Sequence, residues 1–187
     1  MSRSRYALLG ILTLGPKAGA DIKRFVDDSI GHFWAESYGN LYPRLHEMEE
    51  AGLVERRTEA RDDGPDAFVY SITPAGRRDF LEWMSRACRE QRVRDELLLR
   101  VFFGREIPLE RTSDQIERFA ERQREILVTF ESVRQRIDTE YAADPNRPFW
   151  LLTLRRGQLV AEARLRWAEE SLAALSDEIP GEVTAPS

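Results

Sequence analysis

The segment from Ser37 to Val54, SYGNLYPRLHEMEEAGLV, carries the clearest recognition chemistry in the chain. Leu41, Leu45 and Met48 follow the i, i+4, i+7 spacing of a buried helical face, yet the start of this helix holds poor helix formers. Helix N-termini bind phosphates, tyrosine hydroxyls reach phosphates, and asparagine pairs with adenine. The segment is therefore shaped for an external partner, and its expected DNA contacts are Ser37, Tyr38, Gly39, Asn40, Tyr42, Pro43 and Arg44.

A catalytic constellation is not found in the sequence. His32 and His46 are the only histidines, and no cysteine and histidine spacing fits a zinc site. The run GILTLGPK lacks the Gly-Lys-Ser/Thr ending of a phosphate-binding loop. We expect a protein that is not an enzyme and that needs no metal and no cofactor.

Composition limits the other possibilities. The 187 residues carry a net charge of −5, so any contact with nucleic acid must come from local basic patches, to which Arg5 and Lys23 can contribute. A single cysteine excludes a disulfide framework and suits a reducing compartment. The apolar run YALLGILTLG superficially resembles a signal peptide, but Pro16 and Lys17 interrupt it, and no later run approaches the length of a membrane span. We expect a cytoplasmic protein that does not contact membranes.

The elements that position the recognition segment follow from periodicity. Helices are expected over 4–14, over 18–31 with Gly31 as the cap, and from Ser37 to Gly52. The runs LVERRTEA and AFVYSIT predict a hairpin that turns at Gly64-Pro65. Thr73 caps a helix that runs to about residue 90 and buries Phe80, Leu81, and Met84 or Trp83. Three helices, a hairpin and another helix are typical of a winged helix-turn-helix domain.

The second half predicts helices only. A short helix, RDELLLRVFFG, precedes two long helical patterns over 111–142 and 149–176, joined by a turn at ADPNRP. Each long pattern carries a heptad-like apolar seam, with Gln123 as a polar break in the first. Such a hairpin has more apolar edge than it can cover, which predicts a homodimer; a monomeric helical core is the alternative. The residues assigned to dimerisation are Ile116, Phe119, Ile126, Phe130, Val133, Ile137, Leu154, Leu165 and Leu172.

The predicted fold is thus mainly α with a small β-hairpin. An N-terminal winged helix-turn-helix domain spans 1–90, an all-helical dimerisation domain spans 91–177, and a flexible tail spans 178–187.

The motifs LYPRLHEMEEAGLVERR and FVYSITPAG resemble the PadR family of bacterial transcriptional regulators. RDELLLRVFFG and LRRGQLVAEARLRWAEESL resemble the virulence-activator α C-terminal domain of its longer-tailed subfamily. The resemblance implies a homodimer that binds double-stranded DNA, commonly a repressor released by a small molecule. It also implies a wing over 57–68, with Arg57 and Arg61 as DNA contacts.

Two departures from the family pattern matter. The second helix opens Gly19-Ala20-Asp21, without the family's usual aromatic residue, and the wing tip reads RDDGPDAF, which is acidic. An acidic tip is repelled by the minor groove. An adaptor that binds a protein partner through the wing is therefore the alternative function. The effector, its pocket, the target genes and the sign of regulation are not specified by the sequence.

Overall fold

The computed structural model describes residues 4–29, 31, 41–61, 64–88 and 94–178. The chain forms two compact units, Met1–Glu90 and Gln91–Ser187. Within the described residues the fold is mainly helical, with one small antiparallel sheet, as the sequence predicts. The expected tail, apart from its first residue, lies outside the described residues.

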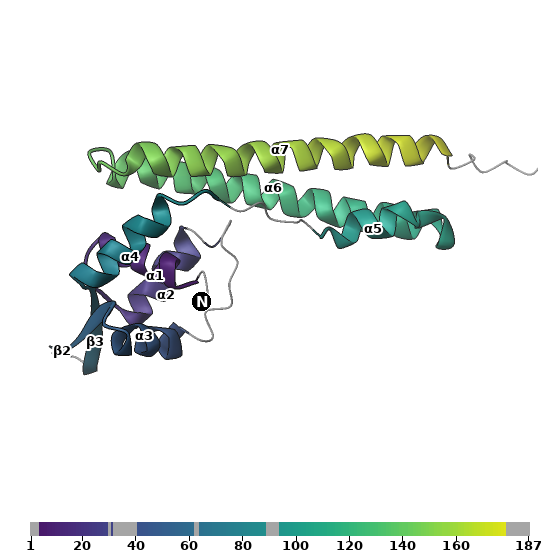
Figure 1. The fold of residues 1–187 in the computed structure, drawn as a ribbon. Helices are drawn as coiled ribbons and strands as arrows, with labels where there is room; N and C mark the ends of the chain where they lie inside the picture. The colour runs from purple at the N-terminus through teal and green to yellow at the C-terminus, as the bar shows by residue number, and fades with distance from the viewer. Residues whose placement is uncertain (1–3, 30, 32–40, 62–63, 89–93, 179–187) are drawn as a thin grey trace, which may run out of the picture. The chain divides into compact units, whose positions relative to one another are not determined.

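The first unit contains the elements expected of a winged helix-turn-helix domain (Figure 1). Its core combines α1, which is buried on most sides, with the inner faces of α2 and α3. Leu41, Leu45 and Met48 are all buried, which confirms the stripe predicted for α3. The elements are α1 (Ser4–Thr13), β1 (Lys17–Ala18), α2 (Gly19–Asp28), α3 (Leu41–Glu50), β2 (Val54–Arg61), β3 (Gly64–Ile72) and α4 (Pro74–Met84).

The sheet has the order β1-β3-β2, with every pairing antiparallel. Val54 pairs with Ile72 and Arg57 with Val69, and the register shifts between Glu59 and Arg61. The β2–β3 hairpin was predicted, whereas β1 was not. Two residues give no alternation to read, so β1 is visible only through its pairing of Lys17 with Tyr70.

The ends of the helices follow local chemistry. The Thr73 hydroxyl accepts a hydrogen bond from the amide of Gly76 at 3.0 Å, which confirms the predicted cap of α4. Gly52 has φ of +68°, the left-handed conformation that ends α3. The chain ends α2 earlier than expected, because Ser29 rather than Gly31 is the cap residue.

The fourth helix departs from the prediction in length and orientation. It ends at Met84 rather than near residue 90, and Leu81 and Met84 are exposed. Phe80 packs on the core as predicted, and of the two alternatives it is Trp83 that does so, stacking on Tyr6 of α1 with ring centroids 4.6 Å apart. The helical face was therefore assigned partly to the wrong apolar residues.

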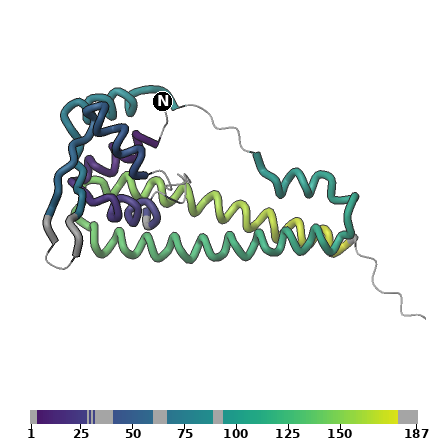
Figure 2. Tube along the Cα trace, turned by 90° about the horizontal axis from the view of Figure 1, so that it is seen from below, coloured from purple at the N-terminus to yellow at the C-terminus, as the bar shows by residue number. Residues whose placement is uncertain are grey.

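The second unit consists of α5 (Glu96–Phe102), a 3₁₀ turn η3 (Gly104–Glu106), α6 (Leu109–Glu140) and α7 (Arg147–Glu178). The two long helices form the predicted αα-hairpin and lie side by side in both views (Figures 1 and 2). Gly157 permits their close approach, since a Cβ there would lie 2.7 Å from the ring of Phe130. Phe119 meets Trp167 edge to face, as Tyr141 meets Trp150 near the turn.

The structure places the residues assigned to dimerisation along the contact between α6 and α7. Ile116, Phe130, Ile137 and Leu154 are buried within a single chain, because the two seams face each other across the hairpin. Phe119, Ile126, Val133, Leu165 and Leu172 are half-buried and pack against the same clusters. Part of the predicted seam therefore packs within one chain, and its use between two chains stays a prediction. Gln123, the polar break, is buried in this interface too.

Candidate nucleic-acid interface

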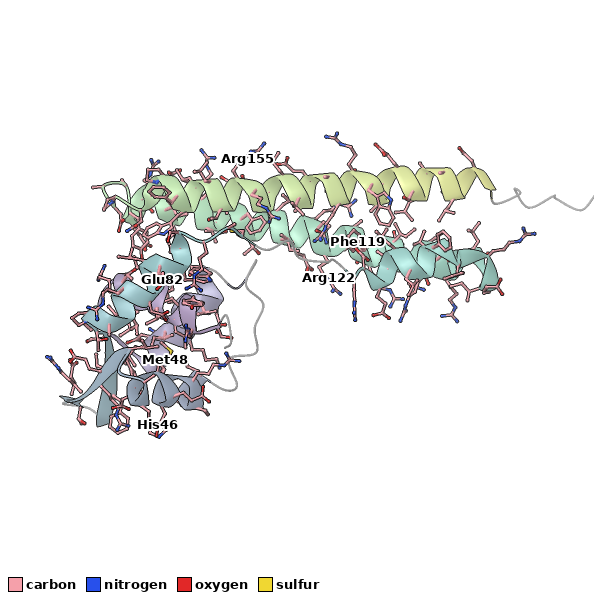
Figure 3. The ribbon with its side chains drawn as sticks, in the orientation of Figure 1. His46, Met48, Glu82, Phe119, Arg122 and Arg155 are labelled. Carbon is pink, nitrogen blue, oxygen red and sulfur yellow. The ribbon has the colours of Figure 1, made fainter. Side chains whose placement is uncertain are left out.

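The outer face of α3 is the centre of the candidate interface. Tyr42, Pro43, His46 and Glu47 are exposed on the side opposite the buried stripe. Figure 3 shows Met48 pointing into the unit and His46 pointing away from it. Pro43 is the third residue of α3 (Leu41–Glu50) as described, and proline is best tolerated near the start of a helix.

Tyr42 is held against the start of α2 by Gly19. A Cβ added to Gly19 would lie 2.5 Å from Cε1 of Tyr42 and 3.1 Å from its hydroxyl oxygen, so only glycine allows this contact. The ring is nevertheless 57% exposed. A hydroxyl donor therefore lies beside the N-terminal turn of α2, where the helix dipole attracts anions, although the same turn holds the Asp21 carboxylate. Phosphate is the anion that this pair of features suits.

Basic side chains also occur on α2, on α3 and on β1, which directly precedes α2. Lys23 is exposed on α2, and Arg44 is half-buried on α3. Lys17 of β1 lies over the ring of Phe25 at 5.6 Å, and Arg24 is exposed but only 3.4 Å from Asp21. The start of α3 and the start of α2 thus belong to a surface with cationic and hydrogen-bonding groups.

The end of α3 has the opposite charge. Glu47, Glu49 and Glu50 occupy its last turns, and the His46 imidazole lies 3.8 Å from Glu49 and 3.5 Å from Glu50. Arg56 of β2 neutralises Glu49 at 3.3 Å and covers the ring of Phe68 at 4.6 Å. Only the first half of α3 therefore suits a polyanion.

Tyr70 lies beneath this acidic end. Burial raises the pKa of its hydroxyl above the usual value; Arg56 opposes the rise and Glu49 adds to it. The side chain is buried and remains a neutral core group at physiological pH.

The described part of the wing carries paired rather than isolated arginines. The Arg57 guanidinium lies 3.2 Å from the Glu55 carboxylate, and both side chains are exposed. Arg61 ends β2, but its side chain lies outside the described residues, as do residues 62–63 at the tip. Arg57 is therefore available to DNA only in competition with Glu55.

Arg5, a predicted DNA contact, is partly buried and joins two helices of the first unit. Its guanidinium lies 3.1 Å from the Asp79 carboxylate of α4 and donates to the Tyr6 hydroxyl at 2.6 Å. Both charged side chains are about three-quarters buried. This pair ties α1 to α4 and gives Arg5 a structural role, while its contact with DNA stays a prediction from sequence.

The remaining predicted contacts are Ser37, Tyr38, Gly39 and Asn40, which lie outside the described residues. They stay predictions from sequence. Among the described residues, no cluster of histidine, cysteine or acidic side chains could hold a metal ion. In the same part of the chain, none of the helices has the length and apolarity to cross a bilayer.

Two family models cover most of the chain. Residues 8–82 match the PadR-like family of transcriptional regulators, and residues 93–176 match the virulence activator alpha C-terminal domain. The chain belongs to the PadR-like family. This family consists of transcriptional regulators, not enzymes.

Curated relatives agree with this assignment over part of their length. The negative transcriptional regulator PadR of Bacillus subtilis is 28% identical over 53% of this chain and 55% of its own length. A probable transcriptional regulator of Mycobacterium tuberculosis is 31% identical over 43% of this chain and 42% of its own. The chain thus spans about half the length of the curated relatives it matches.

Solved structures of the family share the fold of both units. Bacillus subtilis PadR in complex with operator DNA has a TM-score of 0.81 at 22% identity, over 93% of this chain and 99% of that one. The Vibrio cholerae virulence activator AphA has a TM-score of 0.74 at 29% identity, over 93% and 98%. Bacillus subtilis PadR is also solved with p-coumaric acid, at 21% identity, a TM-score of 0.73, and coverage of 92% and 94%.

Sequence reasoning missed two features of this PadR-like chain. The packing of Tyr42 on Gly19 joins residues that are far apart in sequence. The unusual Gly19-Ala20 opening was the sequence signal that could have indicated it. The second feature is an apolar stripe on the outer side of α7, whose residues are interleaved with those of the inner seam. Assigning every apolar residue to one seam concealed it.

Proposed function

We propose that this chain binds operator DNA as a cytoplasmic homodimer and represses transcription until a small-molecule effector releases it. The observation that carries the DNA-binding part is the arrangement of Tyr42 against Gly19, which places a hydroxyl donor at the positive end of α2. Family membership supports the role, as does the operator complex of Bacillus subtilis PadR. The name of that relative supports repression, and its complex with p-coumaric acid supports an effector.

In the proposed complex the first half of α3 enters the major groove. Asn40 and Ser37 would read or approach base edges, whereas Tyr42, Arg44 and Lys23 would hold phosphates. The acidic end of α3 would then point away from the duplex.

Titration of labelled DNA tests sequence-specific binding. Fluorescence anisotropy should show at least about a thousandfold preference for a fragment from upstream of the chain's own gene over a scrambled fragment. Equal affinity for both fragments would contradict the proposal. A reporter gene behind the same fragment reports the sign of regulation, since deletion of a repressor raises expression.

Homodimerisation is proposed through the outer side of α7. Leu152 and Leu159 each precede a buried seam residue, Leu154 and Ala161, by two positions. Two positions turn an α-helix by about 200°, so these leucines lie on the side opposite the seam. Leu152 is 69% exposed and Leu159 is 49% exposed, and Phe149 lies on the same face. One helix therefore has two apolar faces, of which the hairpin covers one.

The second unit exposes further apolar residues on α5. Leu98, Leu99, Phe102 and Phe103 are all exposed, and the two phenylalanines contact each other edge to face. Monomeric proteins seldom expose so many large apolar side chains on neighbouring elements. In a twofold-symmetric dimer, a second copy of the chain could cover the apolar surfaces of both α5 and α7.

Light scattering at micromolar concentration tests the dimer. The wild-type chain should have the mass of a dimer, and Leu159→Glu should shift it toward the monomer, because the carboxylate would be buried without a partner. Thr129→Glu, an exposed position of α6, is the control and should remain dimeric. A dimeric Leu159→Glu variant would contradict the proposed face.

An adaptor function is the second candidate, favoured by the charges of the wing. Arg57 is paired with Glu55, and the tip sequence adds three aspartates. An adaptor would bind neither DNA fragment in the titration above. It would instead bind a protein partner in a manner that depends on the wing aspartates.

A further inference from the structure

Two neighbouring arginines of β2, Arg56 and Arg57, have different surroundings although they are adjacent in sequence. Successive residues of a strand point to opposite faces of the sheet. Arg56 lies opposite Tyr70 in the sheet and on the same face as Val54, and both of these neighbours are buried. Arg57 lies on the other face, where its side chain is 73% exposed against 39% for Arg56. Arg56 is therefore the arginine of this pair on the core side of β2.

The guanidinium of Arg56 is already held by groups of the first unit. Its Nε lies 3.3 Å from Oε1 of Glu49 on α3, and its Cζ lies 4.6 Å from the centre of the Phe68 ring on β3. Burial raises the pKa of the Tyr70 hydroxyl, and the charge of Arg56 opposes that rise. An arginine that is stacked on a ring and paired with a carboxylate can reach a phosphate only by giving up those contacts.

Glu49 is the carboxylate of α3 that lies in line with Tyr42. The two residues are seven positions apart, which brings Glu49 back to the same side of the helix two turns later. Glu47 and Glu50 lie farther round, because each residue turns the helix by about 100°. At 1.5 Å per residue, Glu49 lies about 10 Å along the axis from Tyr42, which is about one Debye length at 0.1 M salt. A free charge at Glu49 would therefore act on phosphates bound near Tyr42.

Glu49 depends on Arg56 for its neutralisation. Its side chain is 27% exposed, and Oε2 is buried without a hydrogen-bond partner among the described residues. The His46 imidazole lies 3.8 Å from Oε2, but an imidazole carries a charge only when it is protonated. A partly buried charge is screened less by salt than an exposed one. Loss of the Arg56 charge would thus leave a negative charge on the side of α3 that carries Tyr42.

We infer that Arg56 supports DNA binding from within the first unit, as the counter-ion that neutralises Glu49, and not as a contact to phosphate. Arg56 is a positioning residue in this sense, because its effect on DNA passes through Glu49. While the pair is formed, the carboxylate in line with Tyr42 does not repel the duplex. The inference rests on the proposed function, since it concerns affinity for DNA.

A set of four full-length chains tests the inference by fluorescence anisotropy with the upstream fragment, at about 50 mM and about 200 mM salt. Arg56→Gln should bind at least fivefold more weakly than the wild type at the lower salt, and the loss should shrink at the higher salt because it is electrostatic. Glu49→Gln should bind at least as tightly as the wild type. The double variant Arg56→Gln, Glu49→Gln should return to within about twofold of the wild type, because the unpaired carboxylate is gone.

Each alternative gives a different pattern. If Arg56 contacted a phosphate, the double variant would stay as weak as Arg56→Gln. If the ion pair acted only as a structural tie between α3 and β2, Glu49→Gln would lose as much affinity as Arg56→Gln. Either pattern overturns the inference, as does unchanged affinity of Arg56→Gln while the wild type binds. A wild-type chain that binds no DNA would overturn the proposed function, and the inference with it.

Two further variants are controls. Arg56→Lys keeps the charge and should bind within about twofold of the wild type; a loss as large as that of Arg56→Gln would overturn the inference. Arg86→Gln likewise frees a carboxylate, that of its partner Glu82 on α4. Figure 3 shows Glu82 well separated from His46 of α3 within the first unit, so Arg86→Gln should bind as the wild type does. An equal loss with Arg86→Gln would overturn the assignment to Glu49.

Discussion

Gly19→Ala is expected to weaken DNA binding while leaving the first unit folded. The added Cβ would lie 2.5 Å from Cε1 of Tyr42, whereas carbon atoms at optimal separation are about 3.5–4.0 Å apart. The ring must therefore move by about 1 Å or more, which it can do because it is 57% exposed. Alanine also favours the helix by at most about 1 kcal/mol, so the free energy of unfolding should change little.

The loss of affinity follows from hydrogen-bond geometry. A hydroxyl donates to an oxygen over about 2.5–3.0 Å, so a displacement of about 1 Å removes the proposed contact with phosphate. A hydrogen bond to a charged group contributes about 1.5–3 kcal/mol, which is roughly a tenfold to hundredfold change in Kd for each half-site. Tyr42→Phe should cause a similar loss.

A double-mutant cycle measured by fluorescence anisotropy separates this reasoning from a general disturbance. If both substitutions act through one hydroxyl, the Gly19→Ala, Tyr42→Phe double variant should bind about as weakly as either single variant. Ala20→Gly, at the next and exposed position of α2, is a control for changes in helix propensity. Unchanged affinity of Gly19→Ala, or losses that simply add in the double variant, would refute the role of Tyr42.

Three further outcomes are expected. Asp79→Asn should lower the free energy of unfolding by about 1.5–3 kcal/mol, measured by urea denaturation, because its partner Arg5 ties α1 to α4. The salt dependence of DNA binding should not change, and a smaller salt slope would indicate that Arg5 contacts DNA. Arg44→Ala should reduce the slope of log K against log salt by about one, and an unchanged slope would argue against a phosphate contact. Tyr70 has a raised pKa when folded, so its contribution is present below pH 10 and is lost as the pH rises through the folded value; alkaline urea titrations should show a flatter pH dependence for Tyr70→Phe.

The parts of the fold that could be predicted are those encoded by local periodicity. The stripe of Leu41, Leu45 and Met48 and the Thr73 cap depend on neighbours within a few positions, and both occur as expected. Strand β1 depends on pairing with β3, more than fifty residues away, and two residues carry no pattern of their own. Its absence from the prediction therefore reflects tertiary pairing.

The candidate site was less predictable because contacts, not residue types, decide the roles of its arginines. Nothing in the sequence around Arg5 shows that its guanidinium is held between α1 and α4 by Asp79, because the two residues are 74 positions apart. The same ambiguity affected α7, where one helix carries two apolar faces and only the structure shows which one the hairpin covers.

The unusual composition of α3 is explained by the opposite charges of its two halves. Pro43 lies near the described start of α3, where a proline is tolerated best. Glu47, Glu49 and Glu50 lie at the negative end of the helix dipole, where acidic residues are mildly destabilising. The buried stripe and the pairing of Arg56 with Glu49 offset that effect. Because these carboxylates would repel a phosphate backbone, the same asymmetry favours approach of DNA to the N-terminal half of α3, where Tyr42 lies.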